Sequence, residues 1–309
     1  MSHRHTHNAS FDYARLIAVI GIIWFHAHAP GAVIGYAGLA FFLLLLVHLA
    51  IPQATQARRQ SHRAPPFLRY AAARGQRLLL PWLIASVAYG MLKLIDVSRG
   101  APFAAEFQLS MWLTGPALHL WFLPFAFATC LALWPLGRFL RQHHKNHVTP
   151  LAFIFTGLAL ASLALAQEAT LVIPLAQWAY ALPIVLFGVA LTLVRAGWMQ
   201  MLGLVTFFVC SALAANWTSG LFEITLASLV LILCRQVPLP ASSLSTGAAR
   251  SALALYLIHP AVLAVMLRSG LVADGTMALA LSVTVVSCGL IALWDALAAP
   301  RLPTLPRLI

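Results

Sequence analysis

Residues 11–28 read FDYARLIAVIGIIWFHAH, an apolar stretch with an arginine near one end and a histidine near the other. Ten residues separate Arg15 from His26, and eleven helical steps of about 100° return almost to the starting direction. Both side chains therefore lie on one helix face, roughly 16 Å apart at about 1.5 Å per residue. Ionisable groups at membrane depth usually face a bundle interior or a polar cavity. Headgroup anchoring by Arg15 and snorkelling by His26 is the alternative explanation.

The rest of the chain has the composition of a polytopic membrane protein. Of its 309 residues, 61% are hydrophobic and 8% are charged, and the mean hydropathy is +0.89. Soluble domains carry about 25% charged residues. The net charge of +12 is spread over short segments between apolar runs, so it indicates membrane topology and we expect no nucleic-acid partner. The four cysteines have no metal-ligand spacing, and we expect no metal site.

The apolar runs predict an all-α protein with about ten transmembrane helices. The predicted spans are 15–29, 36–52, 78–95, 117–136, 149–167, 171–194, 198–215, 219–234, 250–267 and 276–298. We expect one transmembrane domain over 15–298, between cytoplasmic tails 1–14 and 299–309. With both termini inside, sixteen of the 19 Lys and Arg residues face the cytoplasm, and only Lys93, Arg99 and Arg268 lie outside. This bias follows the positive-inside rule.

Three further motifs carry polar or aromatic side chains at the ends of predicted spans or within them. Arg74-Gly75-Gln76-Arg77 enters the third span, and two guanidinium groups three residues apart can clamp a phosphate or simply anchor the helix. His119-Leu120-Trp121-Phe122-Leu123-Pro124 begins the fourth span and fits an interfacial aromatic belt. Ala254-Leu255-Tyr256-Leu257-Ile258-His259-Pro260 lies in the ninth span, where Tyr256 and His259 can be buried and hydrogen-bonded to each other or to carbonyls freed by Pro260.

Together, and in this order, these motifs resemble the acyltransferase 3 family of integral membrane acyltransferases, especially members that modify bacterial exopolysaccharides. The family pattern has Arg or Lys, ten residues and His in the first helix, Arg-x-x-Arg before the third, a Trp-Phe-Leu element, and a late Tyr-Leu-Ile-His-Pro element. The chain departs from the family pattern in the second span. The family commonly has Phe-Phe-x-x-Ser-Gly there, whereas in this chain Phe41-Phe42 is followed by Leu43-Leu44-Leu45-Leu46. The esterase-like domain that some relatives carry is also missing.

The resemblance implies an O-acyltransferase, most simply an O-acetyltransferase, in the bacterial inner membrane. The enzyme would transfer an acyl group from cytoplasmic acyl-CoA to a hydroxyl of a glycan or lipid-linked saccharide, with no bound cofactor. His26 is then the catalytic centre, as general base or as transient acyl carrier. Arg15, which can pair with Asp12, orients the donor.

The resemblance also implies substrate-binding roles. Arg74 and Arg77 would meet the phosphates of the donor at the cytoplasmic mouth. Trp121, Tyr256 and His259 are further candidates for substrate binding. The competing class is a transporter for a polysaccharide or lipid intermediate, because kinked helices with intramembrane His and Arg suit that function as well. No inverted repeat is visible in the sequence, which disfavours the transporter.

Overall fold

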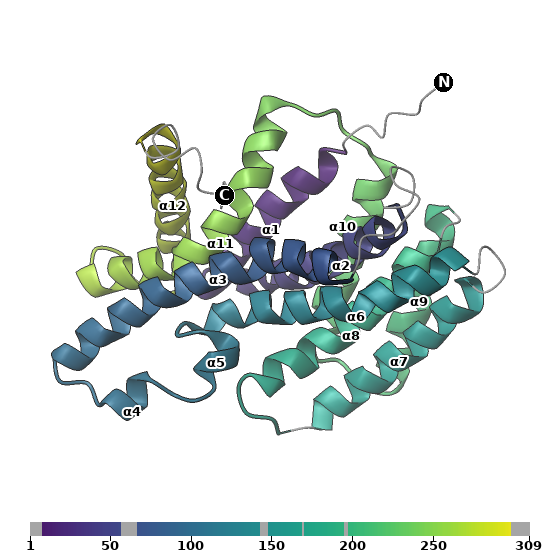
Figure 1. Ribbon diagram of the computed structural model, residues 1–309, viewed down its shortest axis with the longest axis horizontal. Coiled ribbons are helices and arrows are strands. Elements are labelled where there is room, and N and C mark those ends of the chain that lie inside the picture. The colour runs from purple at the N-terminus through teal and green to yellow at the C-terminus, as the bar shows by residue number, and fades with distance from the viewer. Residues whose placement is uncertain (1–7, 57–66, 143–147, 169, 195–196, 298–309) are drawn as a thin grey trace. The chain divides into compact units, whose positions relative to one another are not determined.

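The computed structural model describes residues 8–56, 67–142, 148–168, 170–194 and 197–297, and its regular elements within these ranges are all helical (Figure 1). The predicted all-α class is therefore confirmed. The helices are α1 (Ser10–His26), α2 (Ala32–Gln56), α3 (Phe67–Ser98), α4 (Phe103–Glu106), α5 (Met111–Thr114), the 3-10 turn η1 (Leu118–Trp121), α6 (Phe122–Gln142), α7 (Val148–Glu168), α8 (Leu175–Leu193), α9 (Trp198–Ala214), α10 (Leu221–Gln236), α11 (Ser243–Ser269) and α12 (Met277–Leu297).

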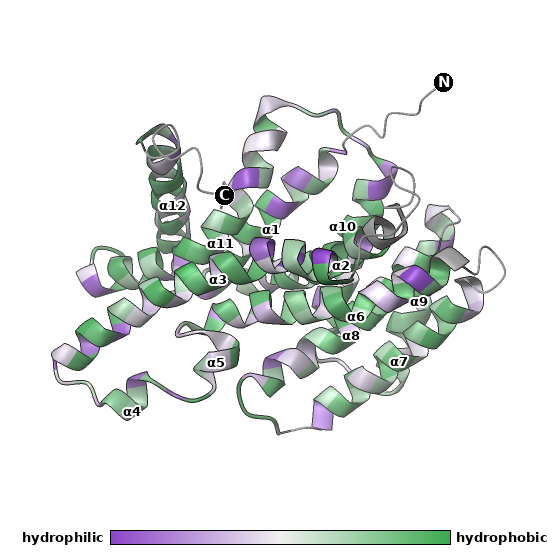
Figure 2. Cartoon of the chain, in the orientation of Figure 1, coloured by the Kyte–Doolittle hydropathy of each residue, from purple (hydrophilic) through white to green (hydrophobic). Residues whose placement is uncertain are grey.

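Apolar residues dominate the long helices, as the hydropathy colouring in Figure 2 shows. Within the described residues, seven helices are long and apolar enough to cross a membrane, so the protein is a multi-pass membrane protein. Each of the ten predicted spans coincides with a helix. Three of these helices, α1, α9 and α10, are not among the seven and have only 16 or 17 residues. Helices of that length are about 24–26 Å long, so they reach across a core of about 30 Å only where the bilayer thins.

Several helices begin earlier than the apolar pattern indicates, because they continue into polar sequence. α1 begins at Ser10 instead of about residue 15, and α11 begins at Ser243 instead of about residue 250. Ser242 caps α11 through a capping box with Ser245, which satisfies backbone donors at the start of the helix. α3 has 32 residues, about 48 Å, and is therefore longer than the hydrocarbon core.

The chain forms two compact units, each described here by itself. Unit 1 contains residues 1–42, 201–209 and 220–309, and unit 2 contains residues 43–200 and 210–219. The helix α2 contributes its first part to unit 1 and its second part to unit 2. Within unit 1, α11 packs along α1 and against α12 (Figure 1). Within unit 2, α3 packs against α6, and α7 lies beside α8.

In unit 1, α1 and the first part of α2 approach each other so closely that only glycine fits. A Cβ atom at Gly35 would overlap the carbonyl group of Gly21, and one at Gly38 would overlap that of Ala18. The contact is made by backbone atoms, as in other membrane helix pairs with small residues at the crossing. Gly188 has a related role in unit 2, where a Cβ atom would lie 3.1 Å from Leu44.

Some of the expected features lie outside the described residues. These are most of the two predicted tails and the basic residues Arg4, Arg58, Arg59, Arg63, Lys145, Arg195, Arg301 and Arg307.

Substituting alanine for Gly35 or Gly38 should destabilise the protein by about 1–3 kcal/mol, because the added methyl group forces α1 and α2 apart. Thermal unfolding of the purified protein in detergent measures this change. Gly203→Ala in α9 is the matched control, since no atom lies within 4 Å of its added Cβ. Equal melting temperatures for all three variants would contradict the close crossing.

Candidate functional site

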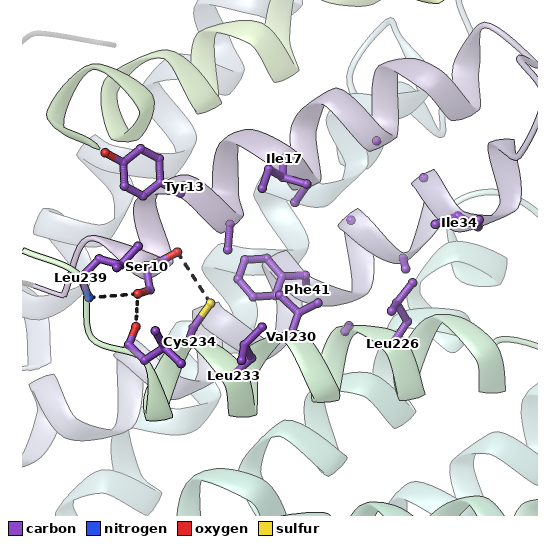
Figure 3. Close-up of a pocket in the computed structure, with 18 residues that line it drawn as sticks. Ser10, Tyr13, Ile17, Ile34, Phe41, Leu226, Val230, Leu233, Cys234 and Leu239 are labelled. Carbon is purple, nitrogen blue, oxygen red and sulfur yellow. Dashed lines mark hydrogen bonds between the residues drawn. The ribbon is translucent and has the colours of Figure 1, made fainter. Parts of the chain in front are cut away.

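The helix α1 carries Arg15 and His26, and its amino end is held by the last turn of α10 and the segment that follows it. The Asn8 side chain donates a hydrogen bond to the Cys234 carbonyl at 2.7 Å, and the Ala9 backbone N–H donates to the Leu239 carbonyl at 3.0 Å. The Ser10 hydroxyl donates to the Val237 carbonyl and accepts from the Leu239 backbone N–H, as Figure 3 shows. The amino end of α1 is thus fixed by residues from far along the chain.

The carboxyl end of α1 is held by apolar packing. Ile23 and Ala27 are buried with Val262 of α11 and Leu279 and Val283 of α12 in one core cluster. The Ala27 carbonyl also accepts a hydrogen bond from the Gly275 backbone N–H at 3.2 Å. These contacts fix the last turn of α1, which carries His26, against α11.

His26 lies beside His259, so the first and fourth motifs meet within unit 1. The ring centroids of His26 and His259 are 5.3 Å apart, and that of Tyr256 lies 6.2 Å from His259. His259 is fully buried and Tyr256 is buried, whereas His26 is half-buried. The site therefore has one partly accessible imidazole backed by a buried one.

The hydrogen bonding of His259 favours one tautomer of its ring. Its Nδ1 lies 3.0 Å from the Leu255 carbonyl oxygen, which can only accept a hydrogen bond. Nδ1 therefore carries a proton, and in the neutral ring Nε2 is the acceptor. A neutral imidazole with a fixed tautomer is suited to orient a neighbouring proton-transfer group.

At the other end of α1, the predicted pairing of Asp12 with Arg15 is confirmed. The Arg15 Nη1 atom lies 3.6 Å from Asp12 Oδ1. Asp12 is fully buried and lies in the first turn of the helix, where a negative charge is favoured by the helix dipole. The carboxylate restricts the guanidinium of Arg15, whose side chain keeps 27% of its surface exposed.

The two arginines of the second motif have different environments within unit 2. Arg74 is half-buried, and its guanidinium stacks over the ring of Tyr70 at 5.2 Å from the centroid. The Tyr70 hydroxyl donates to the Cys130 carbonyl of α6 at 3.2 Å, which connects this group to the α3–α6 packing. Arg77 is exposed. Both arginines keep an accessible edge, so an anionic group can reach them, but only Arg74 is held in place by packing.

The third motif forms part of an aromatic cluster in unit 2. Trp121 is 5% exposed and contacts the Phe125 ring edge-on, with centroids 5.8 Å apart. His119 is buried and contacts Tyr89 of α3 at 5.2 Å. Trp121 is thus a packed side chain whose ring has little accessible surface.

The predicted site residues fall into two groups. Arg15, His26, Tyr256 and His259 lie in unit 1, and Arg74, Arg77 and Trp121 lie in unit 2. Sequence reasoning missed the exposed pair of His28 and Asp274, whose Nδ1–oxygen distance is 3.2 Å. No short motif connects these two residues, because the pair joins the turn after α1 to the loop before α12.

A groove of about 490 Å³ also lies beside α1 in unit 1 (Figure 3). Its walls come from α1, the first part of α2, and α10 with the segment after it, and the side chains of Phe41 and Val230 both line it. Among the described residues that line it, Ser10 and Tyr13 are polar and none is charged. The groove can hold an apolar group, and neither His26 nor His259 is among the residues that line it.

In the part of the chain that the structure describes, no group of three His, Cys, Asp or Glu side chains could hold a metal ion. Comparison with protein-family models, with curated proteins and with solved structures finds no match to this chain. The family resemblance therefore rests on the four motifs and their order.

Proposed function

We propose that this protein is an integral membrane O-acyltransferase of the bacterial inner membrane. It moves an acyl group, most simply acetyl, from cytoplasmic acyl-CoA to a hydroxyl of a glycan or lipid-linked saccharide. The observation that carries the proposal is the contact of His26 with His259, because it brings two motifs far apart in the sequence to one place. Proton transfer at a hydroxyl needs a group that titrates near neutrality, and histidine is that group.

In the proposed reaction, His26 takes the proton of the acceptor hydroxyl while the hydroxyl oxygen attacks the thioester carbonyl. The carbon–sulfur bond breaks, and the CoA thiolate leaves and receives the proton from His26. In the second form of the mechanism, a ring nitrogen of neutral His26 attacks the thioester carbonyl, the carbon–sulfur bond breaks, and the CoA thiolate leaves with the proton of the other ring nitrogen. The acceptor oxygen then attacks the acyl group, the nitrogen–carbon bond breaks, and the hydroxyl proton returns to the imidazole. His259 supports the His26 ring in both forms, through its fixed tautomer.

The cationic groups have separate roles in this proposal. Arg74 and Arg77 bind the phosphates of the donor, for which a planar guanidinium offers paired hydrogen bonds. Arg15, held by Asp12, orients the acyl end of the donor on the His26 face of α1. Both termini are cytoplasmic in this arrangement, as the distribution of Lys and Arg predicts.

Replacing His26 by asparagine should lower acyl transfer by at least about 10²-fold, which is the usual loss when a general base is removed. His28→Asn is a matched control two residues away, because its side chain is 70% exposed and contacts Asp274 instead of His259. Asparagine also tolerates the positive φ of 49° at position 28. The measurement is glycan acylation normalised to membrane abundance. Near-normal acylation in His26→Asn would reject His26 as the catalytic centre.

Lysine at position 77 should raise the apparent KM for acyl-CoA although it keeps the charge, because an ammonium lacks the planar fork that pairs with phosphate. Arg77 is exposed, so the change leaves packing intact. Arg74→Lys should have the same effect and also lower the melting temperature, since it removes the stacking on Tyr70. Arg69→Lys, at an exposed position on the same helix, is the control. Unchanged kinetics in both variants would indicate topological anchoring alone.

Sidedness can be tested at the two ends of α11. Single cysteines replace Leu271, which is 79% exposed, and Ser243, which is exposed, in a background without the native cysteines. An impermeant thiol reagent should label position 271 in intact cells, and position 243 only after permeabilisation. Labelling at position 243 in sealed cells would overturn the orientation and the cytoplasmic donor site.

A further inference from the structure

The groove beside α1 in unit 1 has a floor of small side chains and a rim of large apolar ones. Its floor includes buried alanine residues from all three helices that form it: Ala14, Ala18, Ala37 and Ala227. Ile17, Ile34 and Leu233 line the rim and are 69%, 62% and 61% exposed. The small residues leave the hollow open, and the large ones present apolar surface beside it.

The length of the groove matches half of a membrane core. On α1 the lining residues run from Ser10 to Gly21. These eleven helical steps rise about 16 Å at about 1.5 Å per residue. The hydrocarbon core of a bilayer is about 30 Å thick, so one leaflet contributes about 15 Å. The groove therefore has the length of one leaflet.

The two ends of the groove differ in polarity. The side chains of Ser10 and Tyr13 line one end, where the Ser10 hydroxyl is hydrogen-bonded to the segment after α10, and the lining toward the other end is apolar (Figure 3). Arg15 and Arg235 lie near the same ends of α1 and α10. Aromatic and basic side chains are typical of the headgroup level of a bilayer. The end at Ser10 is therefore the one that faces a membrane surface.

The width of the groove suits a hydrocarbon chain better than a protein segment. Spread over a length of about 16 Å, its volume of about 490 Å³ gives a mean cross-section of about 30 Å². An α-helix with its side chains is about 10 Å wide and needs about 80 Å². A methylene chain whose apolar neighbours lie about 4.5 Å away needs about 20 Å². The groove therefore admits one hydrocarbon chain and excludes a helix.

The groove lies on the side of α1 away from Arg15 and His26. At 3.6 residues per turn, Ile17 is about 160° around the helix from Arg15. Neither His26 nor His259 lines the groove. A chain bound there is thus not in contact with the proposed catalytic group, and it belongs to a molecule other than the acyl donor. A bilayer lipid supplies such a chain at the right level and with a polar end at the membrane surface.

We propose that the groove between α1, α2 and α10 holds one acyl chain of a bilayer phospholipid from the leaflet next to Ser10. The chain packs on the alanine floor, and the headgroup stays outside the groove near Ser10 and Tyr13. The lipid supports α1 from the side opposite His26. This inference needs only that the protein lies in a bilayer, so it stands or falls separately from the proposed acyl transfer.

The test places a large side chain in the groove. Native mass spectrometry of the protein released from palmitoyl-oleoyl phosphatidylglycerol nanodiscs should show one retained phospholipid. Val230→Trp should lower this retention by about tenfold, because the indole displaces at least two methylene groups of the chain. Leu229→Trp is the matched control, since Leu229 is the neighbouring residue on α10, is 41% exposed and does not line the groove.

Thermal unfolding in detergent measures folding and lipid binding together. Added phosphatidylglycerol should raise the melting temperature of the wild type and Leu229→Trp, because a ligand bound to the native state stabilises it, and should raise that of Val230→Trp less. Ile17→Ser shortens the rim at a 69% exposed position, where overpacking is impossible, and should also lower retention.

Three outcomes would overturn the inference. The first is a wild type without retained lipid, or equal retention in the wild type and all three variants. The second is replacement of the lipid by palmitoyl-CoA at equal concentration, which would make the groove a donor site. The third is a dimer of the wild type that Val230→Trp dissociates and Leu229→Trp preserves, since a second copy would then occupy the groove.

Discussion

The packing of the last turn of α1 against α11 and α12 determines where His26 lies relative to His259. Ile23 and Ala27 are buried against Val262, Leu279 and Val283, with no polar atom among these side chains. Such contacts are individually weak and collectively strong. They fix the backbone position of His26, because this residue lies between Ile23 and Ala27 in the same helical turn.

The two units divide the chemistry between them. Unit 1 carries the groups suited to proton transfer, with one buried and one half-buried imidazole. Unit 2 carries the guanidinium groups of Arg74 and Arg77 and a packed cluster of aromatic side chains around Trp121. An acyltransferase needs recognition of an anionic donor and a base. The proposed assignment uses each group for the chemistry to which its charge and burial suit it.

The sequence predicted the helices well because length and apolar content alone decide whether a segment can lie in a bilayer. It also predicted the pairing of Asp12 with Arg15, since residues three apart on a helix are neighbours. It placed the starts of α1 and α11 too late, because their first turns are polar and are held by hydrogen bonds, of Ser10 with residues after α10 and of Ser242 with Ser245. The contact between His26 and His259 depends on tertiary packing that no local pattern encodes.

The hydrogen bonds that hold the amino end of α1 join residues very distant in the sequence. Asn8 and Cys234 are separated by 226 residues. A ribosome adding roughly 5–20 residues per second needs about ten to fifty seconds to cover that distance, and α1 stays in the membrane without its final partners during this interval. The contact between His26 and His259 therefore forms only after α11 has been synthesised. A nascent chain that ends before α11 contains His26, Arg15, Arg74 and Arg77 but lacks the neighbouring imidazole of His259 on which the proposed acyl transfer depends.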